Sequence, residues 1–469
     1  MRKIKSKLEV LSEDEVLRIN DAALRILDEI GILAPNRELL AMCRERGCVI
    51  DDARQIVRFP RKLMDAFIDG MRRKVPDKVS DEAQKLSGYI STQVTLVDYE
   101  TNTRRYGLRD DNLKNIKLVE HLKNIPVTNA AVVPSDVPYE IADVVTIADI
   151  HKYSTKPGGT YILTPTGAKY VARVNKLLGL KSGYLFELIS PLSFKADTIE
   201  MALLFAKEGG DLWIAPMAMG STTAPMTVAG TLTQETAEVL GSIFLVHTMT
   251  GGYPGFSASC HTSDLKTMIC SFGSPNQALF AVASGQLARF YGIQGGTNTG
   301  LTDALSPDFQ GGFEKGLTAA FNSLSGLWGI GCQGIVGADQ GFSFEQLVID
   351  NEWIDYYNYI IGGFEVSDET IGFDIIKSVG PAGNYLGEEH TVAHMRDSYW
   401  ISSIFGRQDW SNWNAGGSRT VYNRAHEYVE EVCADYKSMI PVKAPDICAG
   451  LDSIVAEAFA EMKSPGKLK

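Results

Sequence analysis

The sequence has no excess of positive charge. Its 45 lysines and arginines are outnumbered by 57 aspartates and glutamates, which gives a formal net charge of −12 and a pI near 5.2. Nucleic acids and anionic membrane surfaces both attract clustered Lys and Arg side chains. The charge balance therefore argues against either of them as a partner.

Long apolar runs are also missing. No stretch reaches the roughly 18 apolar residues that a membrane-spanning helix needs, so we expect no membrane partner. The first residues, "MRKIKSKLEV", are basic, but the polar segment "LSEDEVLRIN" follows where a secretory signal would carry its apolar core. We therefore expect a cytoplasmic protein.

Cysteine pairs and histidine clusters, the usual signs of metal sites and disulfide frameworks, are scarce. The seven cysteines contain no C-x-x-C pair, which favours free thiols. His390 and His394 have the i,i+4 spacing of a shared helix face, but Thr391 stands where the metalloprotease motif has glutamate. We expect no bound metal, and a role for the two histidines in packing or in a hydrogen bond to substrate.

What the sequence does contain is a long alternation of short apolar segments with helical ones. Such alternation predicts an α/β protein with a parallel sheet, and eight strand–helix units predict a closed (β/α)8 TIM barrel. The first candidate strand has a second interpretation, a hairpin that closes the barrel floor. The candidates are "YISTQVTLVDY" (89–99), "VTNAAVV" (127–133), "GTYILT" (159–164), "YLFELIS" (184–190), "DLWIAP" (211–216), "GFSAS" (255–259), "FYGIQGG" (290–296) and "GCQGIVG" (331–337).

Helical segments flank this alternation on both sides. Ser12 and Glu15 form a capping box before an amphipathic helix that Gly31 ends. We predict a mainly helical N-terminal cap over residues 1–80, the barrel over 81–363, and a C-terminal helical extension over 364–469 that packs on the barrel.

The segment "GIGCQG" (329–334) matches the G-x-G-x-x-G spacing of dinucleotide-binding loops. That fingerprint must follow a strand and open a helix. Here it follows a helical segment, "FEKGLTAAFNSLSG", and leads into the β-prone, glycine-rich "IVGADQG" before a helix cap at Ser343. The context is reversed, so these glycines predict a tight helix-to-strand turn rather than a cofactor site.

Four stretches are similar to the trimethylamine methyltransferase family, and the resemblance covers essentially the whole chain. They are "LSEDEVLRINDAALRILDEIG" (11–31), "TDALSPDFQGGFEKGLTAA" (302–320), "FEQLVIDNEWI" (344–354) and "FEVSDETIGFDIIKSVGPAGNYLGEEHTVAHMR" (364–396). The resemblance implies a TIM barrel that moves a methyl group from an amine to the cobalt(I) of a separate corrinoid protein. It also implies that the chain forms homo-oligomers and binds no cofactor directly, the corrinoid (cobalamin) being supplied by the partner. Several residues of the longest stretch are expected to hold the C-terminal helices on the barrel.

One departure from the family bears on the substrate. Relatives that act on trimethylamine carry pyrrolysine near the end of the strand that here reads "GCQGIVGADQG", and this sequence has only standard residues there. Gly334, beside Gln333, is our assignment of the vacant position. The resemblance is therefore to the pyrrolysine-free branch, which demethylates quaternary amines such as glycine betaine, proline betaine or carnitine.

The lack of pyrrolysine is chemically consistent with a quaternary amine as substrate. When cobalt(I) attacks a methyl group of a quaternary ammonium ion, the leaving group is a neutral tertiary amine and needs no proton. Trimethylamine would leave as an amide anion unless it were first protonated or captured. The protein then has mainly to position the methyl group and exclude water.

A permanent cation without N–H donors is bound by aromatic faces and carboxylates. We expect the substrate site among residues near strand ends, with His261, Gln333, Gln340 or Arg396 as donors to a betaine carboxylate. Phe186 and Glu187 alternate, so only one of them can face the barrel axis. The substrate-binding candidates are Tyr99, Tyr161, Phe186, Glu187, Trp213, His261, Gln340, Phe342 and Phe344, and the catalytic candidates are Gln333, Gly334 and Asp303.

Two other functions stay open. One is demethylation of a tertiary amine, which needs a carboxylic acid near the leaving nitrogen, with Glu187, Asp303 or Asp339 as candidates. The other is a betaine-binding protein without catalysis. Among quaternary amines, overall resemblance favours proline betaine.

Overall fold

The computed structural model describes residues 4–74 and 82–462. Within them strands and helices alternate as the sequence predicts, and eight strands are each followed by a long helix. The strands are β4 (Ser87–Ile90), β7 (Thr128–Asn129), β8 (Gly158–Gly159), β9 (Gly183–Phe186), β10 (Asp211–Ile214), β12 (Phe256–Ala258), β15 (Gly295–Thr297) and β16 (Gly329–Gln333).

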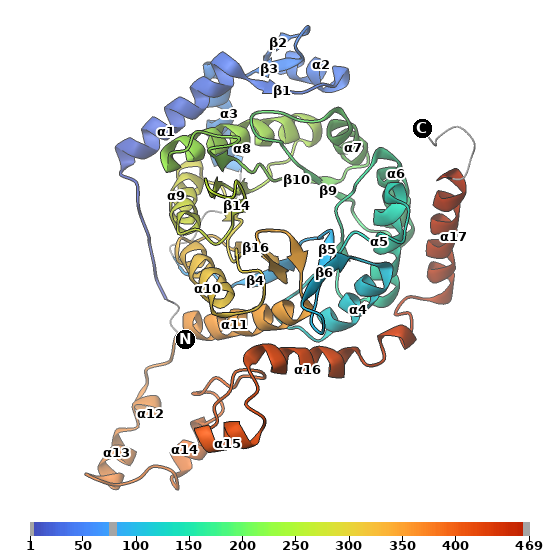
Figure 1. Ribbon diagram of the computed structural model, residues 1–469. Helices are drawn as coiled ribbons and strands as arrows, with labels where there is room; N and C mark the ends of the chain where they lie inside the picture. The colour runs from blue at the N-terminus through green and yellow to red at the C-terminus, as the bar shows by residue number, and fades with distance from the viewer. Residues whose placement is uncertain (1–3, 75–81, 463–469) are drawn as a thin grey trace.

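The helices that follow these strands form a ring, and Figure 1 shows the strands inside it. They are α4 (Arg109–Glu120), α5 (Ala142–Tyr153), α6 (Pro165–Leu178), α7 (Ala196–Lys207), α8 (Val228–Thr250), α9 (Asn276–Tyr291), α10 (Phe309–Leu324) and α11 (Phe344–Gly362). A 3-10 turn, η2 (Tyr139–Ile141), leads into α5.

The strands pair in parallel, but the ladder is not continuous. β7 pairs with β8, β9 with β10, and β12, β15, β16 and β4 form a four-stranded sheet. No ladder joins β4 to β7, β8 to β9 or β10 to β12 among the described residues. The protein is a mixed α/β fold with several parallel sheets, and the expected closed barrel is not confirmed. Strand length gives a reason, because β7 and β8 have two residues each and β8 is Gly-Gly.

The first candidate strand, 89–99, is in fact two strands. β4 joins the ring, while β5 (Thr95–Asp98) pairs with β6 (Thr103–Tyr106) as an antiparallel hairpin. A second hairpin, β17 (Ile335–Val336) with β18 (Gly341–Phe342), follows β16, and β18 pairs with β5. Further short strands, β11 (Met219–Gly220), β13 (His261–Ser263) and β14 (Cys270–Ser271), form a small sheet beyond β10 and β12.

The "GIGCQG" segment has the expected context. It lies between α10 and the β17–β18 hairpin, and β16 occupies most of it. Because no helix opens after Gly334, its glycines do not present a helix N-terminus to a pyrophosphate. The next helix, α11, begins where predicted, with the Ser343 side chain accepting from the Gln346 N–H at 3.1 Å.

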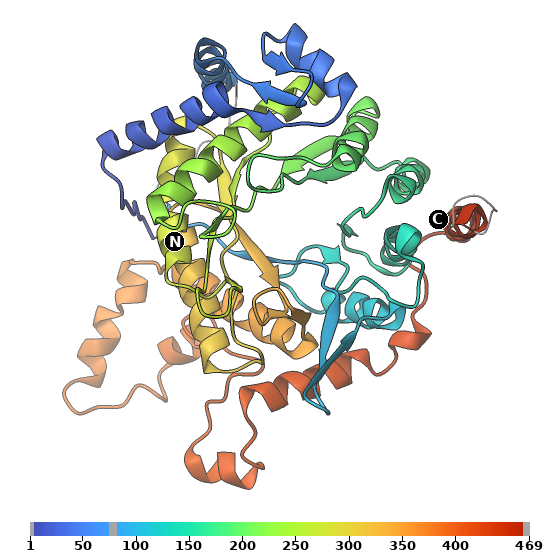
Figure 2. The same ribbon diagram turned by 45° about the horizontal axis from the view of Figure 1, so that its top comes forward.

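The N-terminal region is less helical than expected. It contains α1 (Glu13–Arg25) with its π-helical end η1 (Ile26–Ile30), α2 (Arg37–Glu45) and α3 (Arg61–Lys74), but also an antiparallel sheet of β1 (Ile32–Leu33), β3 (Ile56–Arg58) and β2 (Val49–Asp51). The predicted capping box is present, with the Ser12 N–H donating to the Glu15 carboxylate at 2.8 Å. The region packs on α8, and both belong to one hydrophobic core. Figure 2 shows it lying across that side of the ring.

The C-terminal region divides into two parts with different surroundings. α16 (Val421–Cys433) and α17 (Pro445–Met462) pack outside the ring against α11 and α4, and against α5 and α6, respectively. The segment between α11 and α16 carries α12 (Asp368–Ile371), α13 (Phe373–Val379), α14 (Glu389–His394) and α15 (Trp410–Ala415), and it projects away from the ring (Figure 1). The residues expected to fasten the C-terminal helices to the barrel lie in this projecting part. Among the described residues, no helix has the length and apolar character needed to cross a bilayer.

Candidate active site

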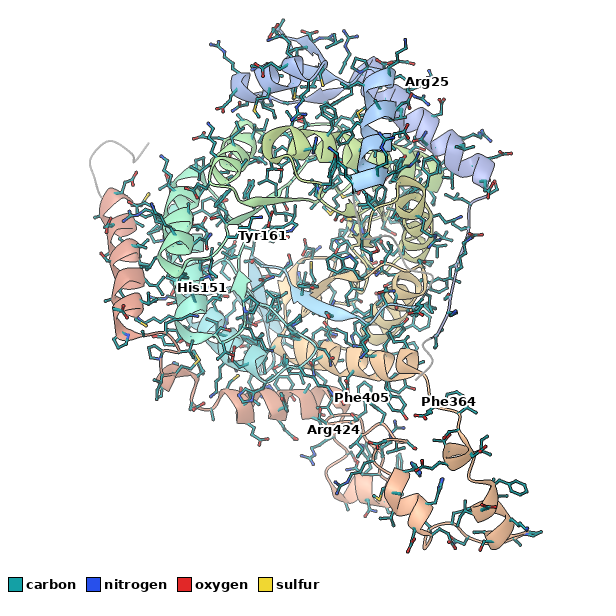
Figure 3. All side chains as sticks on the ribbon, turned by 180° about the vertical axis from the view of Figure 1, so that it is seen from behind. Arg25, His151, Tyr161, Phe364, Phe405 and Arg424 are labelled. Carbon is teal, nitrogen blue, oxygen red and sulfur yellow. The ribbon has the colours of Figure 1, made fainter. Side chains whose placement is uncertain are left out.

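A cavity with a volume of about 820 Å³ lies at the interruption between β8 and β9. It extends from the inside of the ring outward between α5 and α6. Its inner wall comes from the segments that end β4, β8, β9, β10 and β16. Figure 3 shows Tyr161 at the inner edge of the ring and His151 on α5, and both residues line the cavity.

Three of the predicted substrate-binding residues, Tyr161, Glu187 and Trp213, line this cavity. Tyr161 follows β8 and Glu187 follows β9 directly, so both lie at the carboxyl ends of parallel strands. Trp213 is 55% exposed on β10, and its indole lies over Gly183 of β9, where a Cβ would come within 2.4 Å of the ring. The glycine therefore makes room for the indole face.

The alternation of Phe186 and Glu187 is resolved in favour of the carboxylate. Phe186 is fully buried in the core and stacks on Phe194, with ring centroids 4.1 Å apart. Glu187 takes the opposite side of the strand and faces the cavity. An acidic group thus faces the same cavity as the side chains of Tyr161 and Trp213.

Glu187 has no compensating partner. Among the described residues, its carboxylate forms no ion pair and accepts no hydrogen bond. Water reaches it from the cavity, yet surrounding protein groups desolvate it, and this burial raises its pKa. A cation placed beside Glu187 would supply the missing partner and favour its ionised form.

A second carboxyl group, that of Asp339, lies close enough for its charge to act on Tyr161. Asp339 has a positive φ of 63° in the turn between β17 and β18, and it accepts a hydrogen bond from Gln93 Nε2 at 2.6 Å. Burial raises its pKa. Burial also raises the pKa of Tyr161, and the negative charges of Glu187 and Asp339 act in the same direction. The phenol therefore stays protonated, and its oxygen lies 3.1 Å from Ser91 Oγ.

Cys332 is a cavity residue that the sequence analysis did not single out. It precedes Gln333 at the end of β16 and lines the cavity. Burial raises the pKa of its thiol to about 12, so the group stays a neutral thiol. The sequence did hold a signal for Cys332. Side chains alternate along β16, so if Gln333 faces away from the cavity, its neighbour Cys332 must face toward it.

The outer end of the cavity has a different character. Burial lowers the pKa of His151 to about 4, with the Lys443 charge adding to the effect, so the imidazole is neutral. Lys181 pairs with Asp211 at 2.6 Å. The Lys156 ammonium donates to the carbonyls of Leu122 and Ile125 at 2.8 Å, near the end of α4. Basic side chains thus gather opposite the acidic, aromatic wall.

The catalytic candidates on β16 are held on the helix side of the strand. Gln333 is fully buried, donates to the Gly331 carbonyl, and packs where a Cβ atom on Gly88 would be. Its Oε1 has no partner among the described residues. Gln333 does not line the cavity, because the alternation along the strand turns it outward.

Gly334 adopts a backbone conformation that excludes a side chain. Its φ is +80°, and a Cβ there would lie 2.3 Å from the Phe342 ring. Its N–H donates to Asp350 Oδ2 at 2.7 Å, and the same carboxyl group pairs with fully buried Lys315 at 2.9 Å. Asp350 also accepts from Trp353 Nε1 at 2.8 Å. This network fixes the end of β16.

Asp303 and His261 have structural partners close to the mouth. Asp303 accepts from Ser271 Oγ at 2.5 Å and from the Phe272 N–H at 2.6 Å, which ties its loop to β14. His261 is fully buried, bonds to Gln277, and has Asn298 Nδ2 3.3 Å from its Nε2. Burial lowers its pKa to about 3, so it carries no charge for a carboxylate.

The remaining candidates lie away from the cavity. Tyr99 stacks on His426 of α16 with ring centroids 3.6 Å apart, and Gln340 accepts from Arg104 at 2.9 Å. Phe342 and Phe344 pack edge to face within the core. Arg396 projects with the segment between α11 and α16. None of the four donors expected for a betaine carboxylate lines the cavity.

The loops around the mouth are fastened to α8 by two buried glutamates. Glu235 accepts from the backbone N–H groups of Ala218 at 2.7 Å and Ser259 at 2.6 Å, which follow β10 and β12. Glu238 accepts from Ser190 Oγ at 2.6 Å, beyond β9. Burial and the neighbouring Glu238 raise the pKa of Glu235 to about 8. Three successive loops are thus held by one helix.

Comparison with known proteins gives consistent matches along the whole chain. The family described as Trimethylamine methyltransferase (MTTB) matches residues 1–463. The chain is 27% identical to a trimethylamine methyltransferase of Desulfitobacterium hafniense (strain DSM 10664 / DCB-2), over 96% of this chain and 94% of that protein. It is 25% identical to a glycine betaine methyltransferase of Desulfitobacterium hafniense (strain Y51), over 98% and 99%. It is 28% identical to a trimethylamine methyltransferase of Methanosarcina barkeri (strain Fusaro / DSM 804), over 96% and 95%.

Proposed function

Because the chain belongs to the trimethylamine methyltransferase family, we propose that it transfers a methyl group from a quaternary amine of the betaine type to the cobalt(I) corrinoid of a separate protein, releasing a tertiary amine. The family membership predicted from the sequence is confirmed, and methyl transfer is the activity of the relatives. The quaternary substrate, the corrinoid partner and the (β/α)8 barrel as the underlying architecture are parts of this proposal.

The unpaired carboxylate of Glu187, in a cavity that Tyr161 and Trp213 also line, is the observation that supports a quaternary amine most strongly. A trimethylammonium group has no N–H to donate, so it binds through charge and through ring faces. Each desolvated cation–π contact contributes about 0.5–2 kcal/mol. Trp213 and Tyr161 supply two ring faces, and Glu187 supplies the opposite charge.

The end of β16 supports the same substrate class. Gly334 has no room for a side chain, because Phe342 fills the space where one would start. An electrophilic residue that captures a tertiary amine has no place at this position. A quaternary amine needs no such help, since it leaves as a neutral amine without a proton.

The corrinoid enters this proposal as the methyl acceptor, carried by its own protein. When bound at the mouth, cobalt(I) would supply a strong nucleophile for the methyl carbon. The cavity volume of about 820 Å³ far exceeds that of a small methylated amine, which leaves space for an acceptor to approach. The work of this chain is to orient one N-methyl group toward the mouth, hold the cation by Glu187, and exclude water.

Tyr161 and Ser91 are suited to positioning. The phenol is a protonated donor at the carboxyl end of β8, and Ser91 holds its oxygen at 3.1 Å. Basic groups at the outer end of the cavity, with Lys443 among the lining residues, complement the carboxylate of a betaine. With acidic groups on its inner wall and basic groups at its outer end, the cavity favours zwitterions over simple tetraalkylammonium ions.

The test is a screen for methyl transfer to cobalamin. Protein, reduced cobalamin and one of glycine betaine, proline betaine, carnitine or γ-butyrobetaine are mixed anaerobically, and methylcobalamin formation is followed by absorbance. We expect one betaine to discharge a methyl group and yield the matching tertiary amine. If none does, with reduced cobalamin or with the corrinoid protein that partners the active relatives, the proposal fails.

Demethylation of a tertiary amine is the second candidate, and the raised pKa values of Glu187 and Asp339 favour it. A carboxyl group with a raised pKa keeps its proton to a higher pH and can give it to the leaving nitrogen. The rate would then fall as pH rises through the pKa of that acid. A quaternary substrate predicts no such fall, so a pH–rate profile separates the two.

Location in the cytoplasm stays a prediction.

A further inference from the structure

Residues 364–399, called the arm here, contain not one buried residue. Their apolar side chains point to solvent, with Phe364 77% exposed, Phe373 66% and Leu386 81%. Val366, Ile371, Ile376, Val392 and Met395 are at least half exposed as well. Figure 1 shows the arm, with α12, α13 and α14, extending away from the body.

In the described structure the hydrogen bonds of the arm join arm residues to one another, and at its end the Arg407 guanidinium lies 6.0 Å from the Tyr399 ring. His390 Nε2 lies 3.2 Å from the Glu369 carbonyl, and Thr391 Oγ1 donates to the Tyr385 carbonyl at 2.6 Å. The chain rejoins the body at Trp400, whose indole N–H donates to Asp355 at 2.9 Å. Among the described residues, no hydrogen bond or ion pair joins the arm to the rest of its own chain.

Such a segment does not keep its shape alone in water. α12, α13 and α14 have between four and seven residues, and isolated helices shorter than about 12 residues are marginal in water. Contiguous exposed apolar surface of this size marks an interaction site in folded proteins. The arm therefore has a binding partner whenever it is ordered.

The body of the same chain has a complementary surface. Phe309, Phe313 and Leu317 on α10 recur every fourth residue and are 85%, 56% and 43% exposed. They form an apolar stripe on the outer side of that helix, and Phe309 and Phe313 stack with centroids 5.9 Å apart. In Figure 1, α10 lies on the side of the ring from which the arm leaves. The arm does not cover its own stripe.

We propose that two copies of this chain dock reciprocally, the arm of each copy covering the α10 stripe of the other. Two matching apolar surfaces that do not meet within one chain are both satisfied by a two-fold arrangement. Ten or so large apolar side chains at half exposure or more amount to roughly 1,000 Å² per copy, since aromatic side chains bury about 150–250 Å² each. A stable dimer needs about 800 Å² per partner, so the available surface suffices.

The oligomeric state of the purified full chain tests the proposal, by size-exclusion chromatography with light scattering at micromolar concentration. We expect dimers, or a multiple of them, for the unchanged protein. An arm variant, Phe373→Glu with Ile376→Glu, and a stripe variant, Phe309→Glu with Phe313→Glu, should each be monomeric. Leu17→Glu, on 52% exposed Leu17 of α1 at the far side of the molecule, is the matched control and should stay dimeric.

Mixing the two variants gives the sharper result. An arm variant retains its stripe and a stripe variant retains its arm, so one of the two contacts can form between them. Equimolar mixing should produce heterodimers detectable by native mass spectrometry, which neither variant forms with itself. A monomeric unchanged protein, or an arm variant that stays dimeric and loses only binding to a corrinoid protein, would overturn the proposal. Because the readout is assembly, it is independent of any failure to transfer methyl groups.

Discussion

The wall of the cavity and the arm both carry aromatic and aliphatic side chains that face away from their own core, but they face different surroundings. Tyr161, Trp213 and Glu187 line a concave space within the ring, fixed by strands and by buried hydrogen bonds. The arm has no buried residue and projects away from the ring. A concave space of this kind suits a small cation, whereas a projecting, exposed apolar segment needs another macromolecule.

The comparison predicts that changes in the ring alter stability and chemistry, while changes in the arm alter assembly. A substitution in the ring that changed assembly, or one in the arm that changed stability or chemistry, would contradict this comparison. Four changes inside the ring follow, from the largest expected effect to the smallest.

Lys315→Met should cause the largest loss. It leaves Asp350 buried without its cation, and breaking a fully buried pair costs about 3–5 kcal/mol of the free energy of unfolding. Thermal and urea denaturation measure the loss. Lys169→Met, on an exposed lysine of α6, is the control and should be neutral. A loss below about 1 kcal/mol would mean that the end of β16 is not fixed by this pair.

Glu187→Gln should lower kcat/KM for methyl transfer by about 100-fold, on the order of 2–3 kcal/mol, because a desolvated cation loses its counter-charge. Folding should not suffer, since Glu187 has no partner in the described structure. Glu200→Gln, an exposed position on α7, serves as the matched variant. Unchanged kcat/KM in Glu187→Gln would remove this carboxylate from the site.

Stability should fall as pH rises between about 4.5 and about 8. Burial raises the folded-state pKa of Glu235 from 4.5 to about 8, so in this window the folded protein binds a proton that the unfolded chain has released. The contribution is fully present below pH 4.5 and is lost as pH rises through about 8. Its limiting slope is about 1.4 kcal/mol per pH unit for one proton.

Melting temperature as a function of pH measures this effect. Glu235→Gln should flatten the fall, whereas Glu365→Gln in the arm should leave it unchanged, because that carboxylate is exposed. Equal slopes in Glu235→Gln and the unchanged protein would show that another group titrates.

Trp213→Ala should have the smallest effect, raising KM by about 10-fold through the loss of a ring face worth about 0.5–2 kcal/mol. Trp213→Phe should recover most of the loss, since a smaller ring still presents a face to the cation. Steady-state kinetics with the active betaine give both values. If Phe is as poor as Ala, the indole acts by shape rather than by its ring face.

Sequence reasoning located the strand–helix alternation because apolar segments and helix caps alternate clearly. It also placed Tyr161, Glu187 and Trp213, since each lies on a predicted strand or just beyond its end. It did not identify the cavity-facing Cys332, because alternation places Cys332 and Gln333 on opposite sides of β16 without telling which side faces the cavity. Tyr99, Phe342 and Phe344 do not line the cavity, and aromatic side chains pack equally well between strands and helices.

Two features of the fold could not be predicted from the pattern of apolar residues in the sequence. The pairing interruption at β8 depends on how far its glycines lie from β9, which sequence does not encode locally. The arm was expected to pack on its own barrel, because it belongs to the predicted C-terminal helical extension and carries the longest stretch that resembles the family. Periodicity indicates that a face will be covered, but not whether the cover comes from the same molecule.

Recognition of positive charge in the cavity is the claim on which the proposed chemistry depends. Calorimetry should compare the betaine that discharges a methyl group with its carbon isostere, in which a neutral carbon replaces the quaternary nitrogen. We predict at least about 10-fold tighter binding of the cation, with a smaller ratio in Glu187→Gln, where only the ring faces still distinguish the two ligands. Equal affinity of the two ligands for the unchanged protein would contradict the account, since shape alone would then explain binding.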